Sequence, residues 1–94
     1  MKKNTLLEKT REISLNKRAV LDYSLIVTEE REHDLFGGSV FSVLVLLIEN
    51  GITVDYEFVY DISRDEEKAV AILETLVYNN VMPGNVSDVV ADIL

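Results

Sequence analysis

Residues 39–60 read SVFSVLVLLIENGITVDYEFVY and contain the strongest structural signal in the chain. Two runs rich in β-branched and aromatic residues flank the pair Asn50-Gly51. Both central positions of a type I′ turn need positive φ, which asparagine and glycine tolerate best. The pattern therefore predicts a β-hairpin with strands at 40–49 and 52–60.

The two-residue turn also predicts the register of the hairpin, because Glu49 must then face Ile52. Counting back from the turn gives one uniformly apolar face, which we expect to be the core: Leu47 with Val54, Val45 with Tyr56, Val43 with Phe58, and Phe41 with Tyr60. The opposite face is half apolar and half acidic, and it carries Leu44, Leu46 and Ile48 beside Asp55, Glu57 and Thr53.

The segments after the hairpin predict two helices. Ser63-x-x-Glu66 has the spacing of a capping box and precedes an apolar stripe with helical period that extends to Val77. Asn79-Asn80 can end this helix, and Pro83-Gly84 prevents its continuation. A last short helix, capped by Asn85 or Ser87, follows.

The segments before the hairpin are a strand and an uncertain terminus. Residues 18–29 alternate apolar and polar side chains with the period of a strand. Residues 1–17 form a marginal helix or a flexible arm, unless Ile13 and Leu15 begin a strand. The predicted fold is α+β: a three-stranded antiparallel meander packed by a long helix and a short C-terminal helix. We expect a basic N-terminal arm at 1–17 and a single domain at 18–94.

Composition excludes several classes of site. The 94 residues include no cysteine and one histidine, so a disulfide framework, a thiolate metal site and a cysteine nucleophile are excluded. No P-loop or GxGxxG pattern occurs. The apolar run from Val40 to Ile48 is shorter than the roughly 20 residues of a membrane-spanning helix, and no secretory signal is present. We predict no cofactor, no membrane partner and a cytoplasmic location.

Charge divides the chain unevenly. The protein has 17 acidic and 9 basic residues and a formal charge of −8, yet six of the basic residues fall in the first eighteen positions: Lys2, Lys3, Lys9, Arg11, Lys17 and Arg18. An acidic body repels nucleic acid, whereas a basic arm can bind it. Nucleic-acid binding through the arm is therefore an alternative function, although the simpler interpretation is a solvated terminus.

The only histidine lies in an acidic loop with Glu29, Glu30, Glu32 and Asp34. Oxygen and imidazole groups are ligands for divalent cations, but this loop lacks EF-hand spacing. His33 as a general base has no recognisable nucleophile near it in sequence. A metal site or an enzymatic site here is the least favoured hypothesis, and we predict no catalytic residue.

Tyr23, Tyr56 and Tyr60 fall on the predicted core side of the sheet. Aromatic side chains on a sheet can stack on unpaired bases, but these share their face with aliphatic residues and have no cations between them. We therefore expect all three to be core residues.

The second face of the sheet is the predicted interaction surface, formed by Leu44, Leu46, Ile48, Asp55 and Glu57. An apolar patch rimmed with acids is typical of a binding surface. Residues 5–15 or 86–94 can instead cover it within one chain. The favoured function is a small non-catalytic interaction or regulatory module that forms a homodimer through this face or through a sheet edge.

Four motifs suggest a family: Phe36-Gly37-Gly38, the Asn50-Gly51 hairpin, Asp61-Ile62-Ser63, and MPGNVSDVV at 82–90. With them, the stretch from Tyr23 to Leu94 resembles an uncharacterised family of small proteins from anaerobic Gram-positive bacteria, a domain of unknown function. The resemblance implies a bacterial, cytoplasmic protein and transfers no site residue.

Overall fold

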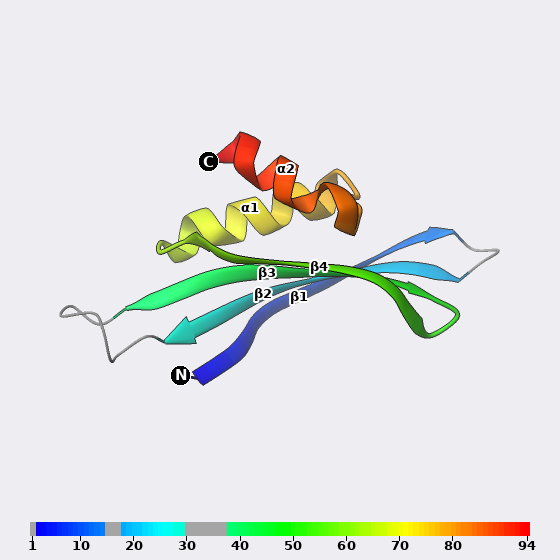
Figure 1. The fold of residues 1–94 in the computed structure, drawn as a ribbon, viewed down its shortest axis with the longest axis horizontal. Helices are drawn as coiled ribbons and strands as arrows, with labels where there is room; N and C mark the ends of the chain where they lie inside the picture. The colour runs from blue at the N-terminus through cyan, green and yellow to red at the C-terminus, as the bar shows by residue number, and fades with distance from the viewer. Residues whose placement is uncertain (1, 15–17, 30–37) are drawn as a thin grey trace.

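The computed structural model describes residues 2–14, 18–29 and 38–94. These residues form a four-stranded antiparallel sheet and two helices. In chain order the elements are β1 (Lys2–Ser14), β2 (Ala19–Glu29), β3 (Ser39–Glu49), β4 (Ile52–Ser63), α1 (Glu66–Tyr78) and α2 (Pro83–Ile93). The strands lie side by side in the order β1-β2-β3-β4, and both helices lie on the same side of the sheet (Figure 1).

The predicted α+β class is confirmed, but the three-stranded meander is wrong. The segment expected to be an arm or a marginal helix is β1, which pairs with β2 from Lys2 opposite Glu29 to Ser14 opposite Ala19. Sequence alternation is obscured here because charged residues occupy both faces of an edge strand. Two register shifts, around Leu6 and around Ile13, interrupt the alternation further.

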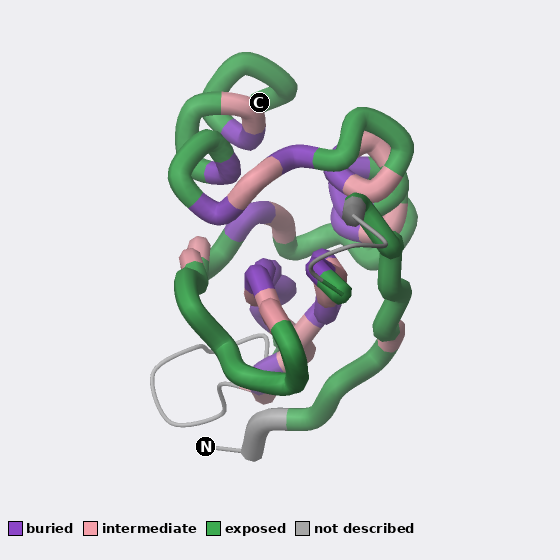
Figure 2. The backbone as a smooth tube through the Cα atoms, turned by 90° about the vertical axis from the view of Figure 1, so that its right-hand side faces the viewer, coloured by how far each residue is buried: buried purple, intermediate pink, exposed green. Residues whose placement is uncertain are grey.

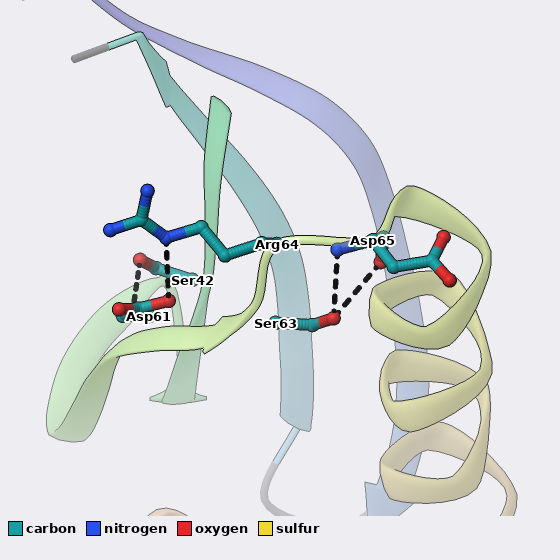
Figure 3. A network of polar contacts seen from close by, with 5 residues as sticks. All are labelled: Ser42, Asp61, Ser63, Arg64 and Asp65. Carbon is teal, nitrogen blue, oxygen red and sulfur yellow. Dashed lines mark hydrogen bonds and ion pairs between the residues drawn. The ribbon is translucent and has the colours of Figure 1, made fainter. Parts of the chain in front are cut away.

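The prediction of one long and one short helix is also wrong, because α1 has 13 residues and α2 has 11. The N-cap of α1 is Asp65, whose carboxylate accepts a hydrogen bond from the backbone N–H of Glu67 at 3.1 Å. Ser63, the expected cap, lies two residues earlier, and its hydroxyl accepts a hydrogen bond from the backbone N–H of Asp65 at 2.9 Å (Figure 3). The predicted helix end is confirmed, with Asn79 as the C-cap.

The core lies between the helices and the two central strands. Alternate residues of β2 and β3 are buried there: Leu21, Tyr23, Leu25, Val43, Val45 and Leu47. The helices contribute their buried stripes: Ala69, Ile72, Leu73 and Leu76 from α1, and Val86 and Val90 from α2. As a result, buried positions concentrate in the centre of the molecule, and the residues of β1 and β4 are largely exposed (Figure 2).

The predicted hairpin turn is confirmed, but the predicted register is wrong. Asn50 and Gly51 have φ of 52° and 81°, and Glu49 faces Ile52. Between the pairs Ile48–Thr53 and Leu47–Asp55, however, β4 carries one extra residue. This β-bulge exchanges the two faces of β4, because the side-chain period of a strand is two.

The bulge moves three aromatic residues out of the expected core. Tyr56, Phe58 and Tyr60 have exposed fractions of 65%, 38% and 46%. Of the three tyrosines predicted in the core, only Tyr23 is buried, and its hydroxyl donates a hydrogen bond to the backbone carbonyl of Val81 at 3.0 Å. Burial raises the pKa of Tyr23 to about 12, although the charge of Arg11 opposes the shift.

A second irregularity ends β4 and directs the chain toward α1. Phe41 faces Ser63 and Val43 faces Val59, so β4 again has more residues than β3 between these pairs. Asp61 adopts a left-handed backbone with φ of 57°, and its N–H donates to the hydroxyl of buried Ser42 at 3.0 Å (Figure 3). The Arg64 guanidinium lies 3.7 Å from the Asp61 carboxylate.

Among the described residues, no helix is both long enough and apolar enough to cross a membrane.

Candidate interaction surface

Neither of the two helices among the described residues covers the second face of the sheet. The side chains of β2 and β3 that alternate with the core residues point away from α1 and α2, because successive strand residues point to opposite faces. We call this surface the outer face. It comprises Glu8, Thr10 and Glu12 from β1, Val20, Asp22, Ser24 and Ile26 from β2, Leu44, Leu46 and Ile48 from β3, and Tyr56 and Phe58 from β4. Thr28, Val40 and Ser42 lie on the same side of the sheet farther along the strands, but they are buried and do not belong to this surface.

The outer face is organised in rows that cross the sheet. One row runs Thr10–Asp22–Leu46–Tyr56, and the next runs Glu8–Ser24–Leu44–Phe58. Each row therefore changes from polar at β1 to aliphatic at β3 and aromatic at β4. The surface has an acidic side and an apolar side.

The three predicted aliphatic residues of the interaction surface do come together. Leu44, Leu46 and Ile48 follow one another along the outer face of β3, and each is half-buried. Two strands flank them, so their remaining exposed surface faces away from the helices. Their placement agrees with the alternation of β3, which the bulge in β4 does not affect.

The two predicted acidic residues of the surface lie elsewhere. Asp55 faces Leu47 and Glu57 faces Val45, on the helix side of the sheet. The Glu57 carboxylate accepts a hydrogen bond from the hydroxyl of Ser87 in α2 at 2.7 Å. The same bulge that brings Tyr56 and Phe58 to the outer face removes these two carboxylates from it.

Tyr56 and Phe58 are therefore the surface residues that sequence reasoning missed. They face Leu46 and Leu44 across the β3–β4 pair. Aromatic residues are enriched in protein interfaces, because they offer a large contact area with few rotatable bonds. No local pattern in the sequence marks the extra residue that reverses their direction.

The acidic side of the outer face contains a carboxyl pair. Asp22 faces Thr10 in β1, and Glu8 lies two residues along that strand. The pKa of Asp22 rises to about 6, because burial disfavours its charge and because the neighbouring Glu8 repels it and shares a hydrogen bond with it. One oxygen of Asp22, Oδ1, is buried and has no hydrogen-bond partner among the described residues.

Among the side chains of the predicted basic arm that the structure describes, Lys9 and Arg11 do not lie on the outer face. Lys9 and Arg11 face Tyr23 and Leu21 on the helix side, and Arg11 Nε donates to Asn80 Oδ1 at 3.1 Å. Arg18 is the turn residue directly before β2 and has φ of 46°. Its backbone carbonyl accepts a hydrogen bond from the backbone N–H of Asn50 at 3.4 Å. Lys2 and Lys3 belong to β1 by their backbone, and Lys17 lies outside the described residues.

The acidic loop considered as a metal or enzymatic site lies mostly outside the described residues. Glu29 ends β2, while the rest of the predicted acidic loop, with Glu30, Glu32, His33 and Asp34, lies outside the described residues. Within residues 2–14, 18–29 and 38–94, no three His, Cys, Asp or Glu side chains gather in a way that could hold a metal ion.

A shallow groove of about 360 Å³ lies between α1 and the end of the chain. Ile72, Ile93 and Leu94 give it an apolar wall, and Lys68 is the titratable residue among the described residues that line it. The described side chains that line the groove include no carboxyl, imidazole or thiol group to act together with Lys68 in catalysis. The outer face is therefore the stronger candidate.

Comparison with known proteins gives a family and no activity. No curated protein and no solved structure matches the chain. A family model described as a family of unknown function, DUF6514, matches residues 2–94. The match includes β1 and both helices, so it covers the whole fold described above. The chain thus belongs to the DUF6514 family of unknown function.

Proposed function

We propose that the protein is a small non-catalytic interaction module and that a second copy of the chain binds its outer face. The observation that supports this proposal is the row of half-buried aliphatic residues on β3 beside exposed Tyr56 and Phe58. An apolar sheet face ordinarily packs against another layer. No element among the described residues provides that layer (Figure 1).

The distribution of charge on the outer face favours a second copy as the partner. Glu8 and Glu12 lie on β1, while Tyr56 and Phe58 lie on β4. When two sheets pack face to face about a twofold axis parallel to their strands, β1 of one copy lies opposite β4 of the other. The acidic sides then stay apart, and the aliphatic residues of β3 in each copy lie opposite β2 of the other copy, close to the axis.

The same charges argue against nucleic acid as the partner. Glu8, Glu12 and Asp22 on the outer face repel phosphate groups, and the protein carries a formal charge of −8. Lys9 and Arg11 lie on the opposite side of β1, where Arg11 is hydrogen-bonded to Asn80. A bacterial origin and a cytoplasmic location stay predictions from the sequence.

The proposal predicts that Leu46→Lys abolishes dimerisation without unfolding the chain. In a twofold interface, each copy contributes the substituted lysine, so the dimer must bury two of them. We therefore expect the affinity of dimerisation to fall on the order of 100-fold or more. Sedimentation equilibrium over a wide range of protein concentration measures the change. Circular dichroism of the same samples checks the fold.

Two further variants make this experiment decisive. Glu74→Lys places the same side chain at an exposed position of α1, and it should dimerise like the wild type. Tyr56→Lys changes a residue that is 65% exposed, so it should fold even if Leu46→Lys does not. A wild-type chain that stays monomeric at every concentration at both pH 7.5 and pH 5.5, or a folded Leu46→Lys variant that still dimerises, contradicts the proposal.

A further inference from the structure

We propose that protonation of the carboxyl pair formed by Asp22 and Glu8 controls association through the outer face. With Asp22 ionised, the surface keeps two copies apart, and with Asp22 neutral, it allows them to pair. The inference rests on the proposed dimer and adds its regulation. Four observations support it, and they concern the position of Asp22, its unsatisfied oxygen, the charges around it and its proton affinity.

Asp22 lies where the acidic side of the outer face meets the apolar side. It lies on β2 between Val20 and Ser24 along the strand, and Leu46 faces it from β3. A second sheet layer packed on Leu46 must therefore also cover Asp22. Burying an unpaired carboxylate under such a layer costs free energy, so ionised Asp22 opposes association.

The carboxyl group of Asp22 is only partly satisfied in the single chain. Its Oδ1 is buried without a hydrogen-bond partner among the described residues, while the group shares a hydrogen bond with Glu8. A hydrogen bond between two carboxyl groups requires a proton on one of them. Neutral Asp22 can therefore satisfy the pair, whereas two carboxylates repel each other.

No described charge near Asp22 offsets its negative charge. On β1, Thr10 faces Asp22, and Glu8 and Glu12 lie two residues to either side of Thr10 on the same face. From β3, the flanking residues are Leu44, Leu46 and Ile48, and from β4 the same row ends in Tyr56, so neither strand presents a cation there. The helices lie on the other face of the sheet (Figure 1).

The surroundings of Asp22 raise its pKa toward neutral pH. The pKa of Asp22 is raised from 3.8 to about 6, chiefly by burial. Covering the outer face with a second copy removes more water from Asp22 and disfavours its ionised form further. Association must then take up protons, and each proton taken up strengthens association about tenfold per pH unit. With one Asp22 in each copy, we expect the dimer dissociation constant to fall at least roughly tenfold between pH 7.5 and pH 5.5.

Sedimentation equilibrium at constant ionic strength at pH 7.5, 6.5 and 5.5 tests the inference. This range stays above the isoelectric point of about 4.5. Wild-type protein should associate more strongly as the pH falls. Asp22→Asn has nearly the same shape without the charge, so it should associate at pH 7.5 about as strongly as the wild type does at pH 5.5.

Two control variants separate Asp22 from other acid effects. Asp88→Asn removes one negative charge from an exposed position of α2, and it should keep the wild-type pH dependence. His33→Gln removes the one histidine, whose ordinary pKa lies in the same range, and it should keep that dependence as well. Loss of the pH dependence in either control overturns the assignment to Asp22.

The remaining outcomes distinguish the two proposals. If the wild type dimerises equally at all three pH values and Leu46→Lys is monomeric, the outer-face dimer stands and its regulation by Asp22 is wrong. If neither the wild type nor Asp22→Asn associates at any pH, both proposals fail. If Asp22→Asn associates more weakly than the wild type at pH 7.5, the carboxylate assists binding and the inference is overturned.

Discussion

Tyr23 and Asp22 are neighbours in β2, and the two polar side chains point to opposite faces of the sheet. Tyr23 is fully buried under the helices, and its hydroxyl has a partner in the carbonyl of Val81. Asp22 is only half-buried on the outer face, and one of its oxygens has no partner among the described residues. The difference explains why we assign a structural role to Tyr23 and a regulatory role to Asp22.

We predict that Tyr23→Phe destabilises the fold by about 1–2 kcal/mol at neutral pH, because the carbonyl of Val81 loses a buried hydrogen bond while the ring volume stays the same. Urea unfolding monitored by circular dichroism measures the difference. A variant with wild-type stability would show that this hydrogen bond contributes nothing net.

Tyr23 should also make the wild type sensitive to alkali. Its pKa is about 12 in the fold and 10.0 without the surrounding structure, so ionisation is easier in the unfolded chain. The contribution of neutral Tyr23 to the free energy of unfolding is fully present below pH 10 and is lost as the pH rises toward 12. Tyr23→Phe should lose less stability than the wild type over that interval, and parallel losses would contradict the assignment.

Among the elements, the β3–β4 hairpin shows how far sequence reasoning extends. The strong local preference of Asn50-Gly51 for positive φ predicts the turn and the facing pair Glu49–Ile52 correctly. The extra residue of β4 has no such local preference, because a bulge depends on how β4 packs against α2 and β3. Every side chain beyond it is therefore predicted on the wrong face.

A matched pair of glycine variants tests the role of the turn. Gly51→Ala should destabilise the fold by about 1–2 kcal/mol, since φ of 81° strains an alanine even though no atom lies within 4 Å of the added Cβ. Gly84→Ala meets equally open space in the first turn of α2, where alanine is favoured, and it should be neutral or stabilising by up to about 1 kcal/mol. Similar effects of both variants on thermal unfolding would show that backbone conformation at Gly51 is not the cause.

The prediction for β1 fails for a different reason. An edge strand contacts the sheet on one side only, so its sequence can stay polar and its apolar pattern weak. Leu7 is its half-buried contact with the core, which is too little to reveal a strand without knowledge of β2. The candidate surface was partly predictable for the same reason: central β3 has a strong pattern, whereas both edge strands depend on their neighbours.

At the scale of the whole molecule, the sheet is asymmetric. Two helices cover one face, and the other presents aliphatic and aromatic residues beside a carboxyl pair. The apolar composition of β3 predicts that both faces need cover. Which face receives the helices depends on long-range packing, for which the sequence offers no local signal.

Strand β1 is an integral part of the fold, because it pairs with β2 along its length and Leu7 packs against the core. We predict that deletion of residues 1–14 abolishes the cooperative unfolding transition, because it exposes the edge of β2 and removes the packing of Leu7 on the core. Removal of a whole strand is expected to cost most of the roughly 5–15 kcal/mol that stabilises a typical domain. Circular dichroism and urea unfolding measure the effect.

Deletion of Leu94 alone is the control for this truncation. Leu94 is 72% exposed at the other end of the chain, so its removal should change stability by less than about 1 kcal/mol. A chain lacking residues 1–14 that unfolds cooperatively near the wild-type midpoint would show that residues 18–94 fold independently.

The order of the elements along the chain has a consequence for the newly made protein. All four strands precede both helices, and each strand pairs with the one made just before it. The first strands can thus pair with one another before residues 66–93 are available to cover them. At roughly 5–20 residues per second, the side of β2 and β3 that the helices later cover stays bare for a few seconds. That interval is when the nascent chain is most open to aggregation and to capture by a chaperone.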